Sequence, residues 1–317
     1  MGARTRDDGR RRARVLGAER LPPPRGPVEG RALLVSDAST ATATTATSEP
    51  ARALAAVPRA GWHVATVAAT RRETANAARL ELEVDGWPGN AAGQHLDLRL
   101  TAPDGYTATR SYSIASSGSG TRVVLAVDRL PDGEVSPFLV NEVRVGDRLE
   151  VHGPLGAFFV WRPVDHGALR SAGDGAGGAA SALRARPVQL IAGGSGIVPL
   201  FAMATAHAEA RDLTPFRMLY SVRTPDDLFF AEELMALAAT SDDFRLDLVY
   251  TRRTPDGWPN PAGRVTREAL EGAVLPATER PIVYVCGSTG FVERVASWLI
   301  ELGHDARDIR TERFGGI

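Results

Sequence analysis

Arg110-Ser111-Tyr112-Ser113 follows a run of alternating apolar and polar residues at 96–100, and a Pro-Asp-Gly turn at 103–105 separates the two. Alternation with a period of two residues is typical of a half-buried strand, so the pattern predicts a hairpin whose second strand carries this stretch. On a regular strand Arg110 and Tyr112 share one face, and the two serines share the other. An arginine near an aromatic ring can hold a phosphate while the ring lies on a planar heterocycle. Taken alone, the stretch favours an ordinary strand with a surface arginine and a core tyrosine.

The composition limits the classes of protein that the chain can represent. It has 317 residues, enough for two domains, and its formal net charge of -1 argues against a general nucleic-acid binder. No apolar run approaches the roughly 20 residues that span a bilayer, and the arginine-rich start lacks the apolar core of a secretory signal. We therefore expect a cytoplasmic monomer that makes no contact with membranes or nucleic acid.

The single cysteine, Cys286, excludes an intramolecular disulfide and a thiolate-ligated cluster. The six histidines show no metal-ligand spacing, so we expect no metal site. Any redox chemistry must then come from an organic cofactor.

The pattern along the chain predicts four parts. Residues 1–59 are rich in Arg, Pro, Ala and Thr, which is typical of a disordered tail or of a start codon assigned too early; a basic docking arm is the functional alternative. Residues 60–164 contain short alternating strands with Gly and Pro between them, which predicts an antiparallel β-barrel. Residues 165–186 have the Gly- and Ala-rich composition of a flexible linker. In residues 187–317 apolar strands alternate with helices, which predicts an α/β domain with a parallel sheet.

Two glycine-containing turns stand before expected helices. Gly133 precedes a short helix in which Ser136 is the expected N-cap and Pro137 the first helical residue, so its N-terminus is suited to an anion. The run from Gly193 to Pro199 follows the first apolar strand of the second half. Its glycines allow the backbone to approach a pyrophosphate, although the run departs from the G-x-G-x-x-G fingerprint.

Six motifs occur in order. They are Arg110-Ser-Tyr112-Ser113, Gly133-x-x-Ser136, Gly153-Pro-x-Gly156, Gly193-Gly-Ser-Gly196-x-x-Pro199, Cys286-Gly287 and the terminal Glu312-Arg313-Phe314-Gly315-Gly316. Together they closely resemble the ferredoxin–NADP reductase family over residues 62–317. The resemblance implies a Greek-key FAD-binding barrel followed by an NAD(P)-binding α/β domain, in a stand-alone reductase without an iron–sulfur module.

The resemblance also implies roles for single residues around the flavin. Arg110 would bind the FAD pyrophosphate, Tyr112 would stack on the isoalloxazine ring, and Ser113 would bind near N5. The remaining FAD contacts that it implies are Ser111, Gly133, Val135, Ser136 and Phe314. Phe314 would shield the ring, although three residues follow it. Glu312 would handle protons beside the reacting atoms.

The nicotinamide nucleotide would lie against the second half of the chain. The resemblance implies that Gly194, Ser195 and Gly196 hold its pyrophosphate, with Cys286 and Gly287 beside the nicotinamide ring. For Cys286, a buried residue at the end of a strand is the alternative. The choice of nucleotide rests on Thr251-Arg252-Arg253, which Arg223 could join: a hydroxyl residue followed by arginine would contact an adenosine 2′-phosphate. This favours NADPH over NADH, although Asp226 and Asp227 nearby weaken that preference.

We therefore expect an FAD-dependent NAD(P)H oxidoreductase that moves a hydride from NADPH to flavin N5. The electrons would pass to a separate ferredoxin, flavodoxin or oxygenase component. Two alternatives stay open: a reductase of a small molecule such as free flavin, a ferric chelate or a quinone, and a flavin-binding subunit without turnover.

Overall fold

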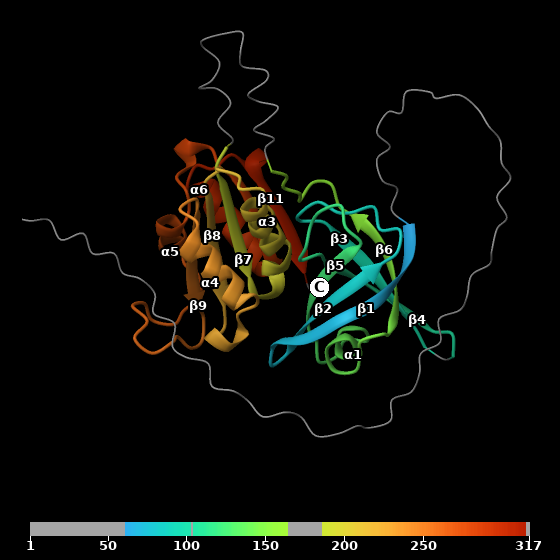
Figure 1. Cartoon of the computed structure of the whole chain (residues 1–317). Helices are drawn as coiled ribbons and strands as arrows, with labels where there is room; N and C mark the ends of the chain where they lie inside the picture. Colours follow the sequence, from blue (N-terminus) through green and yellow to red (C-terminus); the bar gives the residue numbers. More distant parts are fainter. Residues whose placement is uncertain (1–60, 103, 164–185, 315–317) are drawn as a thin grey trace, which may run out of the picture. The chain divides into compact units, whose positions relative to one another are not determined.

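The computed structural model describes residues 61–102, 104–163 and 186–314, which form two sheets with helices (Figure 1). The tail expected at 1–59 lies outside the described residues, as does the expected linker apart from Arg186. Within the described ranges, no helix is long and apolar enough to cross a membrane.

The first half of the chain forms one antiparallel sheet of six strands in the order β4-β3-β6-β1-β2-β5. The strands are β1 (Gly61–Thr74), β2 (Ala77–Val84), β3 (His95–Thr101), β4 (Thr107–Ser113), β5 (Arg122–Asp128) and β6 (Arg148–Leu155). The two outer strands also meet, because Ile114 forms a bridge with Leu125 and the Ala115 N–H donates to the Val124 carbonyl at 2.7 Å. This connection closes the sheet and confirms the predicted barrel.

The alternation that predicted the strands also builds the barrel core. Leu80 and Leu82 on β2 are completely buried, as are Leu96 and Leu98 on β3. Strand β1 is longer than its apolar pattern indicates, because its second half is polar and contains two register shifts. This polar part makes contacts outside the barrel, which explains why no alternation marks it in the sequence.

Helix α1 (Ser136–Asn141) begins one residue earlier than predicted. The expectation that Ser136 caps it was wrong: Val135 is the N-cap, Ser136 is the first helical residue and Pro137 the second. The Ser136 hydroxyl instead accepts a hydrogen bond of 3.0 Å from the N–H of Leu130. Serine side chains compete for nearby backbone groups in this way, and here the bond ties the preceding turn to the helix.

The second half forms a parallel sheet in the order β11-β10-β7-β8-β9, as the α/β pattern predicted. Its strands are β7 (Val188–Gly193), β8 (Phe216–Val222), β9 (Phe244–Tyr250), β10 (Ile282–Ser288) and β11 (Ile309–Phe314). Strand β11 was not predicted, because three of its six residues are charged and it pairs with β10 alone.

Helices cover both faces of this sheet. They are α3 (Ile197–Glu209), α4 (Ala231–Thr240), α5 (Arg267–Ala273) and α6 (Thr289–Glu301), with short 3-10 turns η1 (Gly194–Gly196), η2 (Pro225–Asp227), η3 (Ala277–Glu279) and η4 (Ala306–Asp308). Leu190 packs with residues of α3 and α4, whereas its neighbour Ile191 packs with residues of α5 and α6. Burial on both faces explains why these strands are apolar without alternation.

The strand order places two loops side by side. From β7 the chain continues through β8 to β9 on one side, and it then returns to β10 on the other side of β7. Ligands of open parallel sheets bind at such a switch point, outside the carboxyl ends of the strands. The turn after β7 and the turn after β10 therefore lie next to each other at this edge.

Candidate active site

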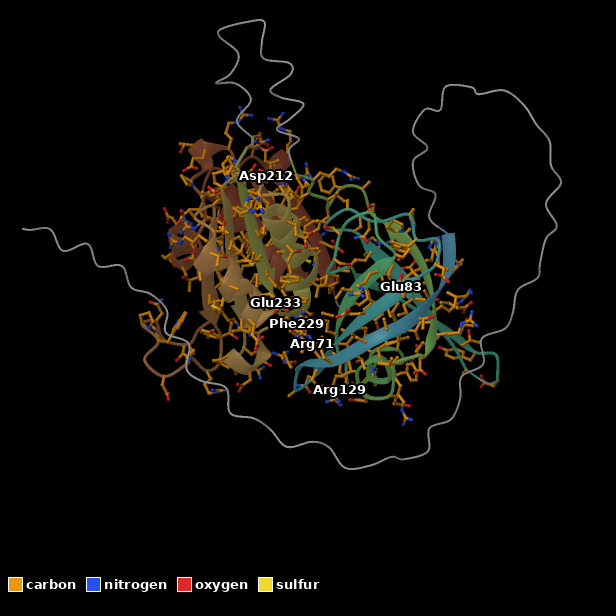
Figure 2. All side chains as sticks on the ribbon, in the orientation of Figure 1. Arg71, Glu83, Arg129, Asp212, Phe229 and Glu233 are labelled. Carbon is orange, nitrogen blue, oxygen red and sulfur yellow. The ribbon has the colours of Figure 1, made fainter. Side chains whose placement is uncertain are left out.

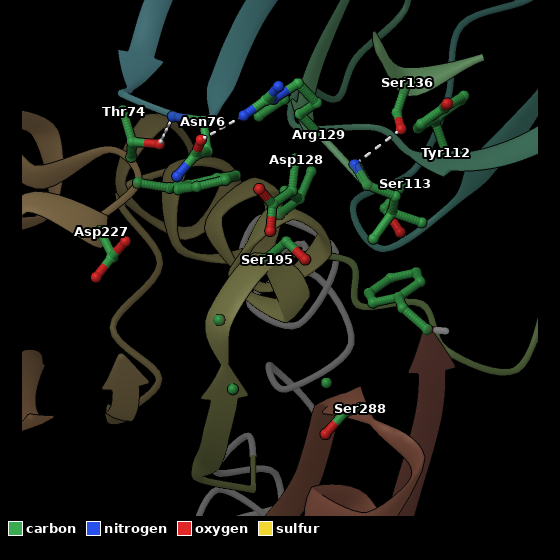
Figure 3. A pocket seen from close by; sticks show the side chains of 18 of the residues that line it. Thr74, Asn76, Tyr112, Ser113, Asp128, Arg129, Ser136, Ser195, Asp227 and Ser288 are labelled. Atoms are coloured by element: carbon green, nitrogen blue, oxygen red, sulfur yellow. Dashed lines mark hydrogen bonds between the residues drawn. The ribbon is translucent and has the colours of Figure 1, made fainter. Parts of the chain in front are cut away.

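A cavity of about 890 Å³ is lined by the barrel and by the carboxyl edge of the parallel sheet (Figure 3). Strand β4, the turn before α1 and the end of β5 line it from the barrel. The turns after β7, β8 and β10 line it from the other half, together with Phe314 of β11. Its volume is within the range of about 300–1,000 Å³ that is usual for ligand sites.

All four residues of the opening stretch line this cavity. On a regular strand Ser111 and Ser113 face away from Tyr112, and the pairing with β3 stays regular through Ser113. The register with β3 ends at Ser113, and the next residues pair with β5. Ser113 is buried, and its hydroxyl donates to Glu312.

Tyr112 offers a largely apolar ring to the cavity. Burial raises the pKa of its phenol to about 12, and the nearby positive charge of Arg110 opposes this only in part. The phenol therefore stays neutral at physiological pH. A neutral, partly buried ring in this position is suited to stacking on a flat heterocycle.

Arg110 forms an ion pair with Glu134, in which its Nη2 atom lies 2.7 Å from Oε2. Glu134 also accepts a hydrogen bond of 2.9 Å from the hydroxyl of Tyr106. About half of each charged side chain is exposed, so this pair is weak. Glu134 was not predicted to belong to the site, and it lines the same cavity as an anionic competitor for the Arg110 guanidinium.

The turn before α1 supplies Gly133, Val135 and Ser136, all of which line the cavity as predicted for FAD contacts. A side chain at Gly133 would approach the Ser136 hydroxyl to 3.0 Å and Leu130 to 3.2 Å. The close approach explains why this position carries glycine.

The glycine loop after β7 divides into two parts. Gly193, Gly194 and Ser195 line the cavity, and Gly194 has a positive φ of 57°. Gly196 does not line it; an added Cβ there would overlap the Cys286 carbonyl. Gly196 thus allows the loop to pack against β10, and this structural role was not visible in the sequence.

Cys286 is completely buried and does not line the cavity, whereas the next two residues, Gly287 and Ser288, do. Burial raises the pKa of its thiol well above the usual value, and the negative charge of Glu312 adds to the effect. The thiol therefore stays protonated. The structure brings the Cys286-Gly287 backbone to the site rather than the sulfur.

Glu312 lines neither cavity, but it contacts Ser113, which lines the first one. Ser113 Oγ lies 3.4 Å from Glu312 Oε1, a long hydrogen bond. Glu312 Oε2 is buried and has no partner within the described residues. Burial raises the pKa of this carboxyl to about 7, although the Ser113 hydroxyl lowers it somewhat. A carboxyl of this kind can exchange a proton near neutral pH.

A second cavity of about 590 Å³ continues from the first, because both are lined by Ser221, Arg223, Thr251, Ser288 and Phe291. Arg252 lines only the second one.

Two further arginines, Arg264 and Arg294, also line the second cavity and were not predicted. They come from the segment before α5 and from α6, so no local motif connects them to Thr251 and Arg252. The tertiary packing of α6 and of the segment before α5 brings these residues to the same cavity as Thr251 and Arg252.

The donor set fits a flavin and a nicotinamide dinucleotide. The first cavity combines aromatic rings, hydroxyl groups and three arginines, and the connected second cavity is lined by four arginines, a composition that favours phosphate. Among the described residues, no group of three or more His, Cys, Asp and Glu side chains is arranged to hold a metal. Fold and site together define a two-domain oxidoreductase that uses FAD and a nicotinamide nucleotide.

Comparison with known proteins agrees with this class. Residues 65–160 match the family model of an oxidoreductase FAD-binding domain, and residues 190–297 match that of an oxidoreductase NAD-binding domain. The two matches together cover more than half of the chain. The chain belongs to the ferredoxin–NADP reductase family of oxidoreductases, which confirms the resemblance seen in its motifs.

Curated relatives include reductase components of oxygenases. The glycine betaine monooxygenase reductase subunit of Chromohalobacter salexigens is 33% identical over 226 residues, which are 70% of this chain and 55% of the relative. The toluate 1,2-dioxygenase electron transfer component of Pseudomonas putida is 30% identical over 222 residues, covering 70% of this chain and 58% of the relative. The chain thus spans little more than half the length of these relatives.

Among solved structures, the flavohem-like FAD/NAD-binding domain of nitric oxide dioxygenase from Vibrio cholerae superposes with a TM-score of 0.67 at 26% identity, covering 81% of this chain and 100% of that chain. A ferredoxin NADP+ reductase from Neisseria gonorrhoeae, with bound FAD and NADP, superposes with a TM-score of 0.62 at 20% identity over 80% of this chain and 98% of that chain. The second similarity concerns the fold alone.

Proposed function

We propose that the protein is an FAD-containing, NADPH-dependent oxidoreductase that delivers electrons to a separate protein acceptor. The observation that carries the proposal is the continuity of the two cavities. They lead from the Ser113–Glu312 contact, past the glycine loop, to the arginines near Thr251. A dinucleotide laid along this path would have its phosphates at the glycine turn and one end beside Tyr112.

The chemistry that the two bound cofactors supply is hydride transfer from nicotinamide to flavin, followed by release of electrons to the acceptor. The protein's part is to bind and orient. Arg110 and the turn at 133–136 would hold the flavin phosphates, and the Tyr112 ring would support the flavin. Ser113 and Glu312 would form a proton-handling pair beside the reacting atoms, because the carboxyl pKa lies near 7.

The preference for NADPH rests on the arginines of the second cavity. Arg223, Arg252, Arg264 and Arg294 line it together with Thr251. A 2′-phosphate carries up to two negative charges and accepts several charge-assisted hydrogen bonds, whereas a ribose hydroxyl does not need such a cluster. Arg253, by contrast, is already paired with Asp226.

The acceptor is proposed from the relatives. Their names describe reductase subunits and electron transfer components of monooxygenases and dioxygenases. We propose that this chain similarly serves an oxygenase component, directly or through a ferredoxin or flavodoxin, and that it acts in the cytoplasm.

The test uses the full chain purified with its cofactor. We expect flavin absorbance, and rapid bleaching of that absorbance after anaerobic mixing with NADPH in a stopped-flow instrument. NADH should bleach it at a lower rate. A protein that neither contains flavin nor takes it up on reconstitution would contradict the proposal. Rates with a ferredoxin and with a ferric chelate, measured in parallel, would separate a protein acceptor from a small-molecule acceptor.

A further inference from the structure

A cluster of four charged side chains connects the hairpin of β1 and β2 to the start of α4. Arg79 binds Glu73 through two nitrogen atoms, with Nε 2.7 Å from Oε2 and Nη2 2.9 Å from Oε1. Its third nitrogen, Nη1, lies 2.5 Å from Oε1 of Glu233. The same Glu233 oxygen accepts a bond of 2.8 Å from Arg71, and Figure 2 shows Arg71 and Glu233 close together.

The centre of this cluster is buried. The side chains of Arg79 and Glu73 are 10% and 5% exposed, whereas Glu233 is 36% and Arg71 55% exposed. Burial raises the pKa of Glu233, but its bonds with Arg79 and Arg71 outweigh this and the pKa lies below the ordinary value. Buried ion pairs add little net stability because desolvation offsets the attraction, yet they tolerate only one geometry. Such a cluster is better suited to fixing positions than to stabilising the fold.

The cluster also holds the backbone before α4. The Glu73 carboxylate accepts a hydrogen bond from the N–H of Phe230. Phe230 has a left-handed φ of 55°, a conformation that costs energy for a bulky residue and is kept only where its surroundings impose it. The Arg79 guanidinium lies over the Phe230 ring at 4.4 Å, and that ring stacks on Phe201 of α3 at 3.8 Å.

Both sides of this junction continue into the wall of the main cavity. On the barrel side, Thr74 and Asn76 in the turn between β1 and β2 line the cavity. On the other side, Arg223, Asp227 and Phe229 line it from the segment that ends at Phe230. The charged cluster therefore lies directly behind the part of the wall where the two sheets meet.

We propose that Glu73, Arg79 and Glu233 are positioning residues that hold the segment 223–230 against the barrel and thereby set the place of the nicotinamide nucleotide relative to the flavin. The inference rests on the proposed function and adds to it. Hydride transfer requires the reacting atoms within about 3.5 Å of each other, and a misplacement of about 1 Å can lower the rate a hundredfold. None of the three residues lines either cavity, so they would act through the segment that they hold.

The variant Glu233→Ala tests this proposal, because it removes the contacts of Glu233 with Arg79 and Arg71 and leaves the buried Arg79–Glu73 pair and the Glu73–Phe230 hydrogen bond in place. Glu232→Ala is the matched control: Glu232 is the preceding residue in the first turn of α4, carries the same charge and is exposed. We expect Glu233→Ala to lower the limiting rate of flavin reduction about tenfold. We also expect it to weaken the long-wavelength charge-transfer absorbance between reduced flavin and NADP+. Flavin content and melting temperature should stay close to those of the control.

Hydrogen–deuterium exchange of the full chain provides a readout without turnover. We expect the peptide containing Phe230 to exchange faster in Glu233→Ala than in Glu232→Ala, and a peptide from β3 to exchange equally in both. Equal reduction rates and charge-transfer absorbance in the two variants would overturn the inference. If the wild-type protein is not reduced by either nucleotide, the proposed function fails instead, and the exchange experiment alone then decides whether the cluster orders the segment.

Discussion

The barrel and the parallel sheet contribute residues to the same cavity in different ways. In the parallel sheet, the contributions come from turns at the carboxyl ends of β7, β8 and β10, and the topology alone brings these ends to one edge. In the barrel, they come from β4, from the end of β5 and from the turn before α1, which are separate segments of one antiparallel sheet and its connections. The parallel sheet thus builds its part by strand order, whereas the barrel builds its part from one strand face and the turns beside it.

The largest expected effect tests whether the turn after β7, which contains Gly196, packs tightly against β10. Gly196→Ala places a Cβ against the carbonyl of Cys286, so the turn must move away from β10. We expect a loss of about 2–3 kcal/mol in the free energy of unfolding, measured by urea denaturation, because overpacking against backbone cannot be relieved by a rotamer change. Gly263→Ala is the control, since an added Cβ meets nothing within 4 Å there. Equal stability of the two variants would show that the turn is adaptable.

The next effect tests the contact between Glu312 and Ser113 through the pH dependence of stability. The folded-state pKa of Glu312 is about 7, above the 4.5 of an unperturbed glutamate, so folding favours the protonated form. Its contribution to stability is therefore fully present below about pH 4.5 and is lost as the pH rises through 7. Between pH 5 and 8 we expect wild type to lose about 2 kcal/mol relative to Glu312→Gln, which cannot ionise.

Urea denaturation at several pH values measures this difference, and the exposed Glu279→Gln serves as the control. A pH dependence that Glu312→Gln leaves unchanged would contradict a buried, titrating carboxyl at this contact.

A smaller effect concerns the choice of nucleotide in the second cavity. Arg252→Gln removes a cation that lines it, whereas Arg253→Gln removes a neighbouring cation that pairs with Asp226. We expect the Kd for NADP+ to rise about tenfold in Arg252→Gln, the equivalent of about 1.4 kcal/mol, with little change for NAD+. Isothermal titration with both nucleotides provides the measurement. An equal change in both variants would indicate a general effect of charge rather than a phosphate contact.

The smallest effect concerns the barrel side. Glu134→Gln removes the carboxylate that pairs with Arg110, which leaves the guanidinium available for a phosphate. Because the pair is half exposed, we expect FAD to bind only about twofold to fourfold more tightly. Fluorescence titration of flavin-free protein with FAD gives the Kd, and the exposed Glu142→Gln is the control. Weaker FAD binding in Glu134→Gln would mean that the carboxylate supports the site.

Much of this fold could be predicted because the apolar pattern follows the strands closely. The strand at 216–222 was predicted with its observed bounds, and the alternation around Leu96 and Leu98 marked β3. The prediction of strands from the sequence failed where a strand consists largely of polar residues. The second half of β1 and all of β11 are stabilised by pairing and by partners far away in the chain, which leave no local period.

The site could be predicted only in part, for a related reason. The motifs predicted many of the residues that line the two cavities, and of the predicted site residues only Gly196, Cys286 and Glu312 line neither cavity. No motif marks Arg264 and Arg294. The sequence left open whether Cys286 lies beside the nicotinamide ring or is buried at the end of a strand. The structure decides for complete burial, because exposure at a strand end depends on what packs over it.

By itself, the sequence determined the two kinds of sheet, because hydrophobic periodicity is a property of short segments. It also determined the order of the sheets and the family, because the motifs and their order are visible in the sequence itself. The tertiary structure alone decided which turns meet, since β7 and β10 are neighbours only after the chain has crossed the sheet. It also decided that Ser113 meets Glu312 across 199 positions of sequence and that Arg79 meets Glu233 across 154. Such contacts depend on burial and on the positions of distant backbone segments, so the local sequence of either segment cannot predict them.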